Sequence, residues 1–238
     1  MNKYNSQPLN QQLKLKVCGI THKKEVLSLD NLGVHYAGVW YGIPNGKYNL
    51  SAHELRLLIN VHTRSLKFIL VTLEKSFQTI YSLIKDTPIY GIQFHGFQLP
   101  SLVKEIKSRF SDQVKIFKVL HIQNNGCLES GFIDRYIEAG VDYFILDNYQ
   151  SRERIGSTGK EVDIRFLDHF IAEKLDRKKV MLAGGINEYN IARLSHLIKP
   201  FGFDIDSSAR TGGRIKAKRV FCILNNLHSI NKEVTYAR

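Results

Sequence analysis

A thiol and a carboxylate are the side chains of this sequence best suited to proton-transfer chemistry. Cys18 ends the short apolar run Leu15–Cys18, and Asp147 ends the run Tyr143–Asp147. Taken alone, each has a structural explanation, because free cysteines are commonly buried as small apolar groups and an aspartate often caps a loop. Placed on opposite sides of one small substrate, they are instead the base and the acid that general acid–base catalysis requires.

Three glycine-containing stretches indicate where an anion would bind: Gly156–Lys160, Ala183–Gly185 and Asp204–Ser208. Glycines let the backbone approach an anion closely, so that its N–H groups bind a phosphate. The first stretch superficially resembles an ATP-binding P-loop, but its spacing is too short for that motif and no strand leads directly into it. We therefore expect a phosphate site and reject an ATP site.

The sequence gives no pattern of metal ligands. Gln93 and His95 stand at the end of one apolar run, where either side chain would suit a substrate contact or satisfy the loop backbone, and His95 has no companion at ligand spacing. Cys18, Cys127 and Cys222 are widely spaced and odd in number, which fits neither a disulfide framework nor a zinc cluster. We expect Cys127 and Cys222 to lie in helices.

The elements that must position these residues alternate along the chain. Eight short β-branched or aromatic runs predict strands, and segments of helical periodicity separate them. The predicted strands are Leu15–Cys18, Tyr36–Trp40, Lys67–Thr72, Gly91–Phe94, Lys115–Leu120, Tyr143–Asp147, Val180–Ala183 and Phe203–Ile205. This order predicts an α/β fold, a single-domain (β/α)8 TIM barrel whose functional residues lie at the carboxyl ends of the strands.

Helix signals fill the gaps between the strands. Ser51 and Glu54 form a capping box for a helix that begins at Ala52. We also expect a helix over Leu128–Ala139, which ends before a glycine, and another over Glu188–Ile198 that Asn187 caps.

Domain limits follow from the same pattern. We expect a polar extension over residues 1–13, the barrel over 14–228 and a tail over 229–238. The long polar connection from Asn148 to Val162 is typical of a functional loop.

Composition restricts the function classes further. The chain has 238 residues, 43% hydrophobic and 24% charged, which fits one barrel domain of a globular protein. The start of the chain has no apolar signal region and no later run could span a membrane, so we expect a cytoplasmic protein without a membrane partner. The net charge of +12 attracts polyanions, but its residues are scattered, so we do not expect nucleic-acid binding as the main function.

Taken in order, these segments resemble phosphoribosylanthranilate isomerase, the barrel enzyme of tryptophan biosynthesis. The resemblance runs from about Leu15 to about Leu227. It depends on six segments in the right order: Lys16–Thr21, Gln93–Gly96, Leu146-Asp147, Gly156–Lys160, Leu182–Gly185 and Asp204–Ser208.

The resemblance implies an activity. The family converts N-(5-phosphoribosyl)anthranilate into 1-(2-carboxyphenylamino)-1-deoxyribulose 5-phosphate by an Amadori rearrangement. Asp147 would be the general acid that opens the sugar ring, and Cys18 would be the base that removes the proton from C2′. No cofactor is implied, because the nitrogen of the substrate serves as the electron sink.

The resemblance also implies binding residues. Substrate contacts fall on Lys47, Gln93, His95 and Asp204, and phosphate contacts on Gly156, Gly159, Gly184, Gly185, Ser207 and Ser208. The chain departs from the family pattern at Lys47, where an arginine is usual, and at Asp206 and Arg210, where a serine and a glutamate are usual. We expect a cation such as Arg210 or Arg214 to offset the charge that Asp206 adds near a phosphate.

Two alternatives stay open. The altered residue at Lys47 is compatible with a barrel isomerase that acts on a different phosphorylated aminosugar. The basic surface is compatible with a non-catalytic barrel that binds a polyanion or a protein partner. In either isomerase interpretation, the partner is a small phosphorylated aminosugar, and the protein is a monomer or a homodimer.

Overall fold

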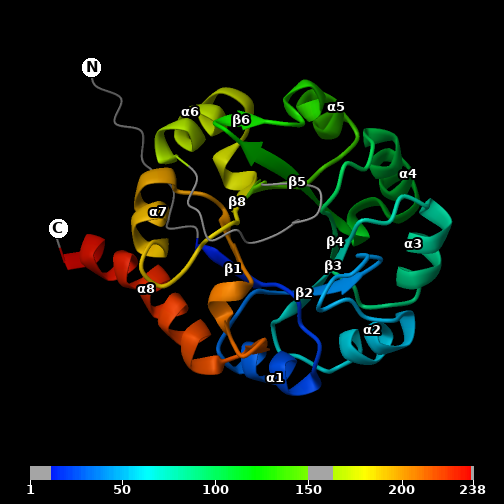
Figure 1. Cartoon of the computed structure of the whole chain (residues 1–238), viewed down its shortest axis with the longest axis horizontal. Coiled ribbons are helices and arrows are strands. Elements are labelled where there is room, and N and C mark those ends of the chain that lie inside the picture. Colours follow the sequence, from blue (N-terminus) through cyan, green and yellow to red (C-terminus); the bar gives the residue numbers. More distant parts are fainter. Residues whose placement is uncertain (1–11, 150–162, 237–238) are drawn as a thin grey trace.

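Eight short strands pair in parallel into a closed ring, and helices cover its outside (Figure 1). This computed structural model describes residues 12–149 and 163–236. The barrel strands are β1 (Lys14–Val17), β2 (Tyr36–Tyr41), β3 (Lys67–Thr72), β4 (Gly91–Phe94), β5 (Lys115–Gln123), β7 (Tyr143–Asn148), β8 (Val180–Leu182) and β9 (Gly202–Ile205). The ring closes because β1 pairs with both β2 and β9. The predicted single-domain (β/α)8 barrel is therefore confirmed.

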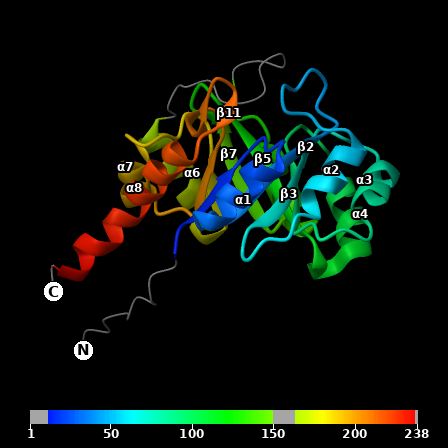
Figure 2. The same cartoon turned by 90° about the horizontal axis from the view of Figure 1, so that it is seen from below.

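Amphipathic helices separate the strands and bury their apolar faces on the barrel. They are α1 (Lys23–Asn31), α2 (Ala52–Ile59), α3 (Phe77–Ile84), α4 (Pro100–Phe110), α5 (Ile133–Glu138), α6 (Ile164–Lys174), α7 (Ile191–Ile198) and α8 (Ala217–Tyr236). The predicted capping box starts α2, where the Ser51 hydroxyl accepts a hydrogen bond from the Glu54 backbone N–H at 3.2 Å. α8 extends well past the barrel wall (Figure 2). The domain limits at 13 and 228 stay predictions.

The segment after β5 differs from the predicted helix Leu128–Ala139. β5 turns back through Asn124 and Asn125, both at positive φ, into the two-residue strand β6 (Gly126–Cys127). Asparagine tolerates this left-handed conformation, which favours a hairpin over a helix. Cys127 therefore lies in a strand, and the prediction that it is helical was wrong; Cys222 does lie in α8. The helix begins only after a 3-10 turn at Ser130–Phe132.

The start of α7 also differs from the prediction. Asn190 occupies the N-cap position rather than Asn187, and α7 begins at Ile191. The side chain of Asn187 is used in the preceding loop, where its amide donates to the Gly185 carbonyl at 3.0 Å. The loop after β8 therefore takes three residues that the sequence pattern assigned to the helix.

The inside of the barrel has an aromatic lower layer and a polar upper layer. Near the amino ends of the strands, the ring of Tyr143 stacks between Phe117 and Phe201, at 4.8 Å and 4.5 Å between ring centroids. Higher in the ring, the buried side chains are charged and include Lys16 and Asp204. The apolar layer closes one end of the barrel, so a ligand has access only from the carboxyl ends of the strands.

The close packing of β1 against β9, where the barrel closes, can be tested at Gly202. A Cβ added at Gly202 in β9 would lie 2.9 Å from the Lys14 carbonyl carbon in β1. We expect Gly202→Ala to lower the free energy of unfolding by about 2 kcal/mol, because the strands must separate to admit the methyl group. Gly131→Ala is the matched control, since no neighbouring atom lies within 4 Å of its Cβ position. Urea unfolding compares the two; equal losses would contradict the tight seam.

Candidate active site

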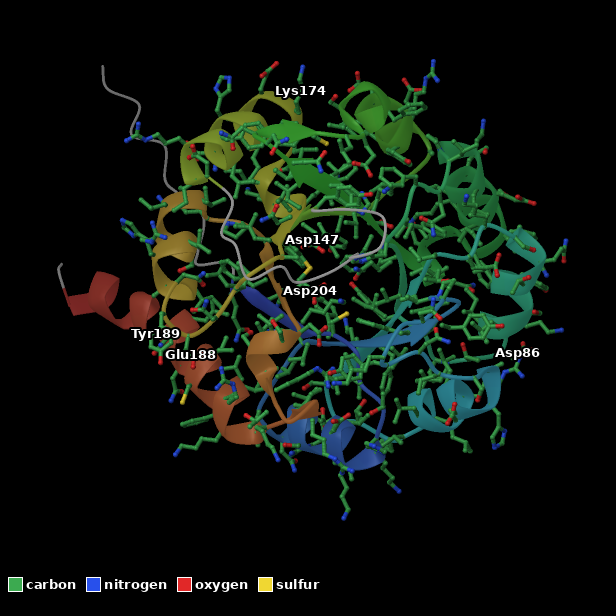
Figure 3. All side chains as sticks on the ribbon, viewed as in Figure 1. Asp86, Asp147, Lys174, Glu188, Tyr189 and Asp204 are labelled. Atoms are coloured by element: carbon green, nitrogen blue, oxygen red, sulfur yellow. The ribbon has the colours of Figure 1, made fainter. Side chains whose placement is uncertain are left out.

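A pocket opens inside the ring at the carboxyl ends of the strands. Polar groups from five different strands or strand ends line it: Cys18, Trp40, His95, Asp147 and Asp204. Side chains alternate between the two faces of a strand, so residues such as Lys16 and Cys18 point to the same side. In Figure 3, Asp147 and Asp204 lie near the centre of the ring, while the other labelled side chains lie around its outside.

Cys18 receives two hydrogen-bond donors at its sulfur. Lys16 Nζ lies 3.2 Å from Sγ, and Trp40 Nε1 lies 3.1 Å from it. Burial raises the pKa of the Cys18 thiol to about 12; the Lys16 charge opposes this rise, and the carboxylates of Asp204 and Asp206 add to it. The thiol is therefore mostly protonated at neutral pH, and it needs additional positive charge to ionise.

Lys16 is a fully buried lysine that joins the thiol to a carboxylate. Its Nζ lies 2.7 Å from Asp204 Oδ2. Burial lowers the pKa of Lys16, but Asp204 and Cys18 together raise it above the ordinary value, so the group remains an ammonium ion. Burial raises the pKa of Asp204, and the Lys16 ammonium opposes that rise. The two side chains form a buried ion pair beside the thiol.

Asp147 is poised as an acid. Burial, and then the negative charge of Asp204, raise the pKa of its carboxyl to about 7. Its Oδ1 atom is buried and has no hydrogen-bond partner among the described residues. A Cβ at Gly184 would lie 2.9 Å from this oxygen, and Gly184 has a φ of +78°, so only glycine fits there without strain. The carboxyl is thus partly protonated near neutral pH and lines the pocket.

His95 contacts Asp147 as a neutral ring. Its Nε2 lies 3.8 Å from Asp147 Oδ2, and burial together with the charges of His121, Lys16 and Lys118 lowers the pKa of His95 to about 3. Gln93 lies behind the ring, with its Nε2 3.0 Å from His95 Nδ1. Gln93 is fully buried and is not part of the pocket wall, so it orients His95 instead of facing the pocket.

The other end of the pocket contains the predicted phosphate loops. Gly184 and Gly185 follow β8, both at positive φ, and Ser207 follows β9; all three line the pocket together with Asp206. β8 and β9 are the seventh and eighth strands of the barrel, the usual place for a phosphate. Ser208 lies beside this wall but is not part of it, and its carbonyl accepts a hydrogen bond from Arg219.

Asp206 has the cationic partner that we expected. Arg210 Nε lies 2.6 Å from Asp206 Oδ1, while Arg214 is exposed on the two-residue strand β11 (Arg214–Ile215). The Arg210 ion pair reduces the repulsion that Asp206 would exert on a bound phosphate.

The structure places one further predicted binding residue, Lys47, outside this pocket. Lys47 is exposed, and its Nζ lies beside Gly213 and 5.6 Å from the Tyr48 ring centroid, outside the pocket wall. Gly156 and Gly159 lie outside the described residues. The roles proposed for all three stay predictions.

Sequence reasoning missed two residues that contact the thiol, Lys16 and Trp40. A signal for Lys16 was present, because it alternates with Cys18 on one strand and a lysine inside a barrel needs a partner. No pattern in the sequence indicates that the indole of Trp40 points at the sulfur, because this contact depends on the pairing of β1 with β2.

The pocket and the fold together define a class of protein: a (β/α)8-barrel protein whose pocket, at the carboxyl ends of the strands, combines a thiol, a carboxyl and glycine-containing loops. Residues 15–225 match the family model of N-(5′-phosphoribosyl)anthranilate (PRA) isomerase. The chain belongs to the PRA isomerase family.

Individual relatives agree with this assignment. The chain is 28% identical over 214 residues to the N-(5′-phosphoribosyl)anthranilate isomerase of Staphylococcus aureus, covering 90% of this chain and 96% of the relative. Among solved structures, phosphoribosylanthranilate isomerase from Thermotoga maritima has a TM-score of 0.76 at 19% identity, with 91% of this chain and 99% of that chain covered. A further isomerase structure, in complex with reduced 1-(o-carboxyphenylamino)-1-deoxyribulose 5-phosphate, has a TM-score of 0.71 at 17% identity over 91% and 99% of the two chains.

The raised pKa of Asp147 predicts a pH-dependent cost in stability. The folded state holds a proton that the unfolded state releases near pH 4, so stability falls as pH rises from about 4 to about 7. We expect Asp147→Asn to remove this fall and to raise the free energy of unfolding at pH 8 by on the order of 4 kcal/mol, with little difference below pH 4.

Urea unfolding at the two pH values measures this effect. Asp86→Asn is the matched control, because Asp86 is an exposed aspartate far from the pocket, and it should change stability little at either pH. An equal effect of Asp147→Asn at both pH values would contradict a buried, protonated carboxyl.

Proposed function

We propose that this protein is an isomerase that converts N-(5′-phosphoribosyl)anthranilate into 1-(o-carboxyphenylamino)-1-deoxyribulose 5-phosphate. The observation that carries the proposal is a thiol and a carboxyl of raised pKa, Cys18 and Asp147, that line one pocket together with the loops after β8 and β9, where we predict the phosphate to bind. Acid–base isomerisation of a phosphorylated sugar needs these three parts. Membership of the PRA isomerase family supports the same reaction.

Ring opening is the step for Asp147. The carboxyl donates its proton to the furanose ring oxygen, the bond from that oxygen to C1′ breaks, and the lone pair of the anilino nitrogen forms an iminium ion. A pKa of about 7 suits a general acid at neutral pH, because a useful fraction of the carboxyl is protonated and yet transfers its proton readily. Neutral His95, 3.8 Å away, contacts the carboxylate that is left behind.

Proton abstraction is the step for Cys18. The thiolate takes the proton from C2′, the electrons of that bond form the C1′–C2′ double bond, and the nitrogen recovers its lone pair. The resulting enolamine tautomerises to the ketone. The iminium charge forms inside the same pocket as the thiol, and the Lys16 ammonium lies 3.2 Å from the sulfur. Both positive charges favour the thiolate at the moment when the base is needed.

Substrate binding completes the proposal. The phosphate would bind backbone N–H groups around Gly184, Gly185 and Ser207, with Ser208, Gly156 and Gly159 as further predicted contacts. Lys47, Gln93, His95 and Asp204 stay predicted substrate contacts. We propose that the protein acts in the cytoplasm as a monomer or a homodimer and without a cofactor. All three cysteines are free thiols. Among the described residues, no helix has the length and apolarity to cross a bilayer.

One observation favours a second candidate function. Lys47 stands where the family pattern has an arginine that binds the anthranilate carboxylate, and it is not part of the pocket wall. A different phosphorylated aminosugar without that carboxylate is therefore the alternative substrate. Turnover of phosphoribosylanthranilate, followed by the loss of its fluorescence, distinguishes the two.

We expect the purified protein to turn over phosphoribosylanthranilate and both Cys18→Ala and Asp147→Asn to lower kcat by about 10³-fold, since each removes one proton-transfer group. Cys222→Ala is the matched control, because that thiol lies in α8 outside the pocket, and it should keep its kcat. A folded wild-type protein without turnover, or a Cys18→Ala variant with full kcat, would contradict the proposal.

A further inference from the structure

The indole of Trp40 is placed as an anion-binding donor to the reactive sulfur. Its Nε1–H group points to Cys18 Sγ at 3.1 Å, and an indole nitrogen is a donor only. Lys16 Nζ, also a donor only, approaches the same sulfur at 3.2 Å. Two donors that converge on one sulfur suit a thiolate better than a thiol, because a thiol would have to direct its own hydrogen elsewhere.

Trp40 is held in this position by a closed chain of contacts. Its ring packs edge-on against Tyr48, with 5.4 Å between ring centroids. The guanidinium of Arg210 stacks on the Tyr48 ring, with its Cζ 3.7 Å from the ring centroid. Arg210 Nη2 in turn donates to the carbonyl oxygens of Cys18 and Gly19, at 2.7 Å and 2.6 Å. The chain of contacts therefore begins at the side chain of Cys18 and returns to its backbone.

Gly19 has the conformation that this arrangement requires. Its φ is +72°, and a Cβ at this position would lie 2.6 Å from Arg210 Nη2 and 2.8 Å from Tyr48 Cδ2. Only glycine adopts this backbone without strain and leaves room for the stacked pair. The close contact of Arg210 and Tyr48 with the end of β1 is thus built into the backbone.

Charges around the sulfur make an additional donor useful. Lys16 from β1, Asp204 from β9 and Asp206 just after β9 act on it. Asp147 from β7 and His95 just after β4 line the same pocket. The carboxylates of Asp204 and Asp206 raise the pKa of Cys18, whereas the hydrogen bond from Trp40 lowers it. Arg210 partly neutralises Asp206 at 2.6 Å. Arg210 therefore has two effects: through Tyr48 it helps to position the Trp40 donor, and it weakens the negative charge of Asp206 that opposes ionisation of the thiol.

We propose that Trp40, Tyr48 and Arg210 form a clamp that fixes Cys18 and stabilises its thiolate, with Trp40 as the donor to the sulfur and with Tyr48 and Arg210 as positioning residues. The inference rests on the proposed role of Cys18 as the base. It adds to that role the means by which a buried thiol, next to two carboxylates, becomes a competent base.

Alkylation by iodoacetamide tests the donor, because it measures thiolate and needs no substrate. In a Cys127→Ser, Cys222→Ser background, Cys18 is the remaining thiol. Below the thiol pKa, the rate is proportional to the thiolate fraction. We expect Trp40→Phe, which keeps an aromatic ring against Tyr48 but loses the N–H group, to slow alkylation at least about tenfold, the effect of one hydrogen bond to a charged group.

The sign of the effect separates the proposal from a merely structural role. A smaller or looser side chain at position 40 would expose the sulfur and leave alkylation unchanged or faster, and that result would overturn the assignment of Trp40. Isomerase activity does not enter this readout. A failure of the proposed reaction is therefore distinguishable from a failure of the clamp.

Fluorescence tests the clamp itself, because Trp40 is the only tryptophan in the chain. Contact with a thiol or thiolate quenches an indole, so Cys18→Ala should raise the emission of Trp40 without unfolding the protein. We expect Arg210→Lys, which keeps a positive charge beside Asp206 but loses the stacking and the two carbonyl contacts, to raise the emission as well and to slow the alkylation of Cys18.

Arg219→Lys is the matched control for Arg210→Lys. Arg219 also donates to a backbone carbonyl after β9, that of Ser208, but it has no contact with the clamp. We expect this variant to leave both the emission and the alkylation rate unchanged. If Arg210→Lys leaves both signals unchanged too, or if the two arginine variants behave alike, the clamp is wrong.

Discussion

The buried ion pair between Lys16 and Asp204 is the interaction on which this structure depends most. The two residues are register partners across β1 and β9, the first and last strands of the barrel. Burying either charge alone would cost several kcal/mol, and only closure of the barrel gives each its partner. The pair also sets the field at Cys18, because Lys16 donates to the sulfur while Asp204 opposes its ionisation. The ion pair between Lys16 and Asp204 therefore both stabilises the closed barrel and influences the ionisation of the Cys18 thiol.

The same ion pair gives the two aspartates in the pocket, Asp147 and Asp204, different electrostatic surroundings. Asp204 has the ammonium as a partner, whereas Asp147 has burial and the charge of Asp204 around it. The Lys16 ammonium favours the charged form of Asp204, whereas burial and the charge of Asp204 raise the pKa of Asp147 to about 7, although both are aspartates inside one ring. The surroundings of each carboxyl, and not its residue type, therefore set its pKa.

The sequence allowed most of the fold and part of the site to be predicted, for physical reasons. Strand order places Cys18, Asp147 and Gly184 at the carboxyl ends of parallel strands, and such ends meet in one place. The position of Lys47 depends on how one loop packs against Tyr48 and Gly213, which no periodicity encodes. The contact of Trp40 with the sulfur likewise needs the register of β1 against β2. Local geometry also explains why Cys127 lies in a strand and why the predicted helix after β5 begins only at Ile133, because two asparagines at positive φ favour a hairpin there.

The assignment of base and acid is the central claim, and a kinetic isotope effect tests it most directly. With substrate carrying deuterium at C2′, weakening the base should make proton abstraction rate-limiting, and weakening the acid should make ring opening rate-limiting. We therefore expect a primary isotope effect on kcat/KM for Cys18→Ser and none for Asp147→Asn. An isotope effect for Asp147→Asn and none for Cys18→Ser would contradict the account, because it would exchange the roles of the two groups.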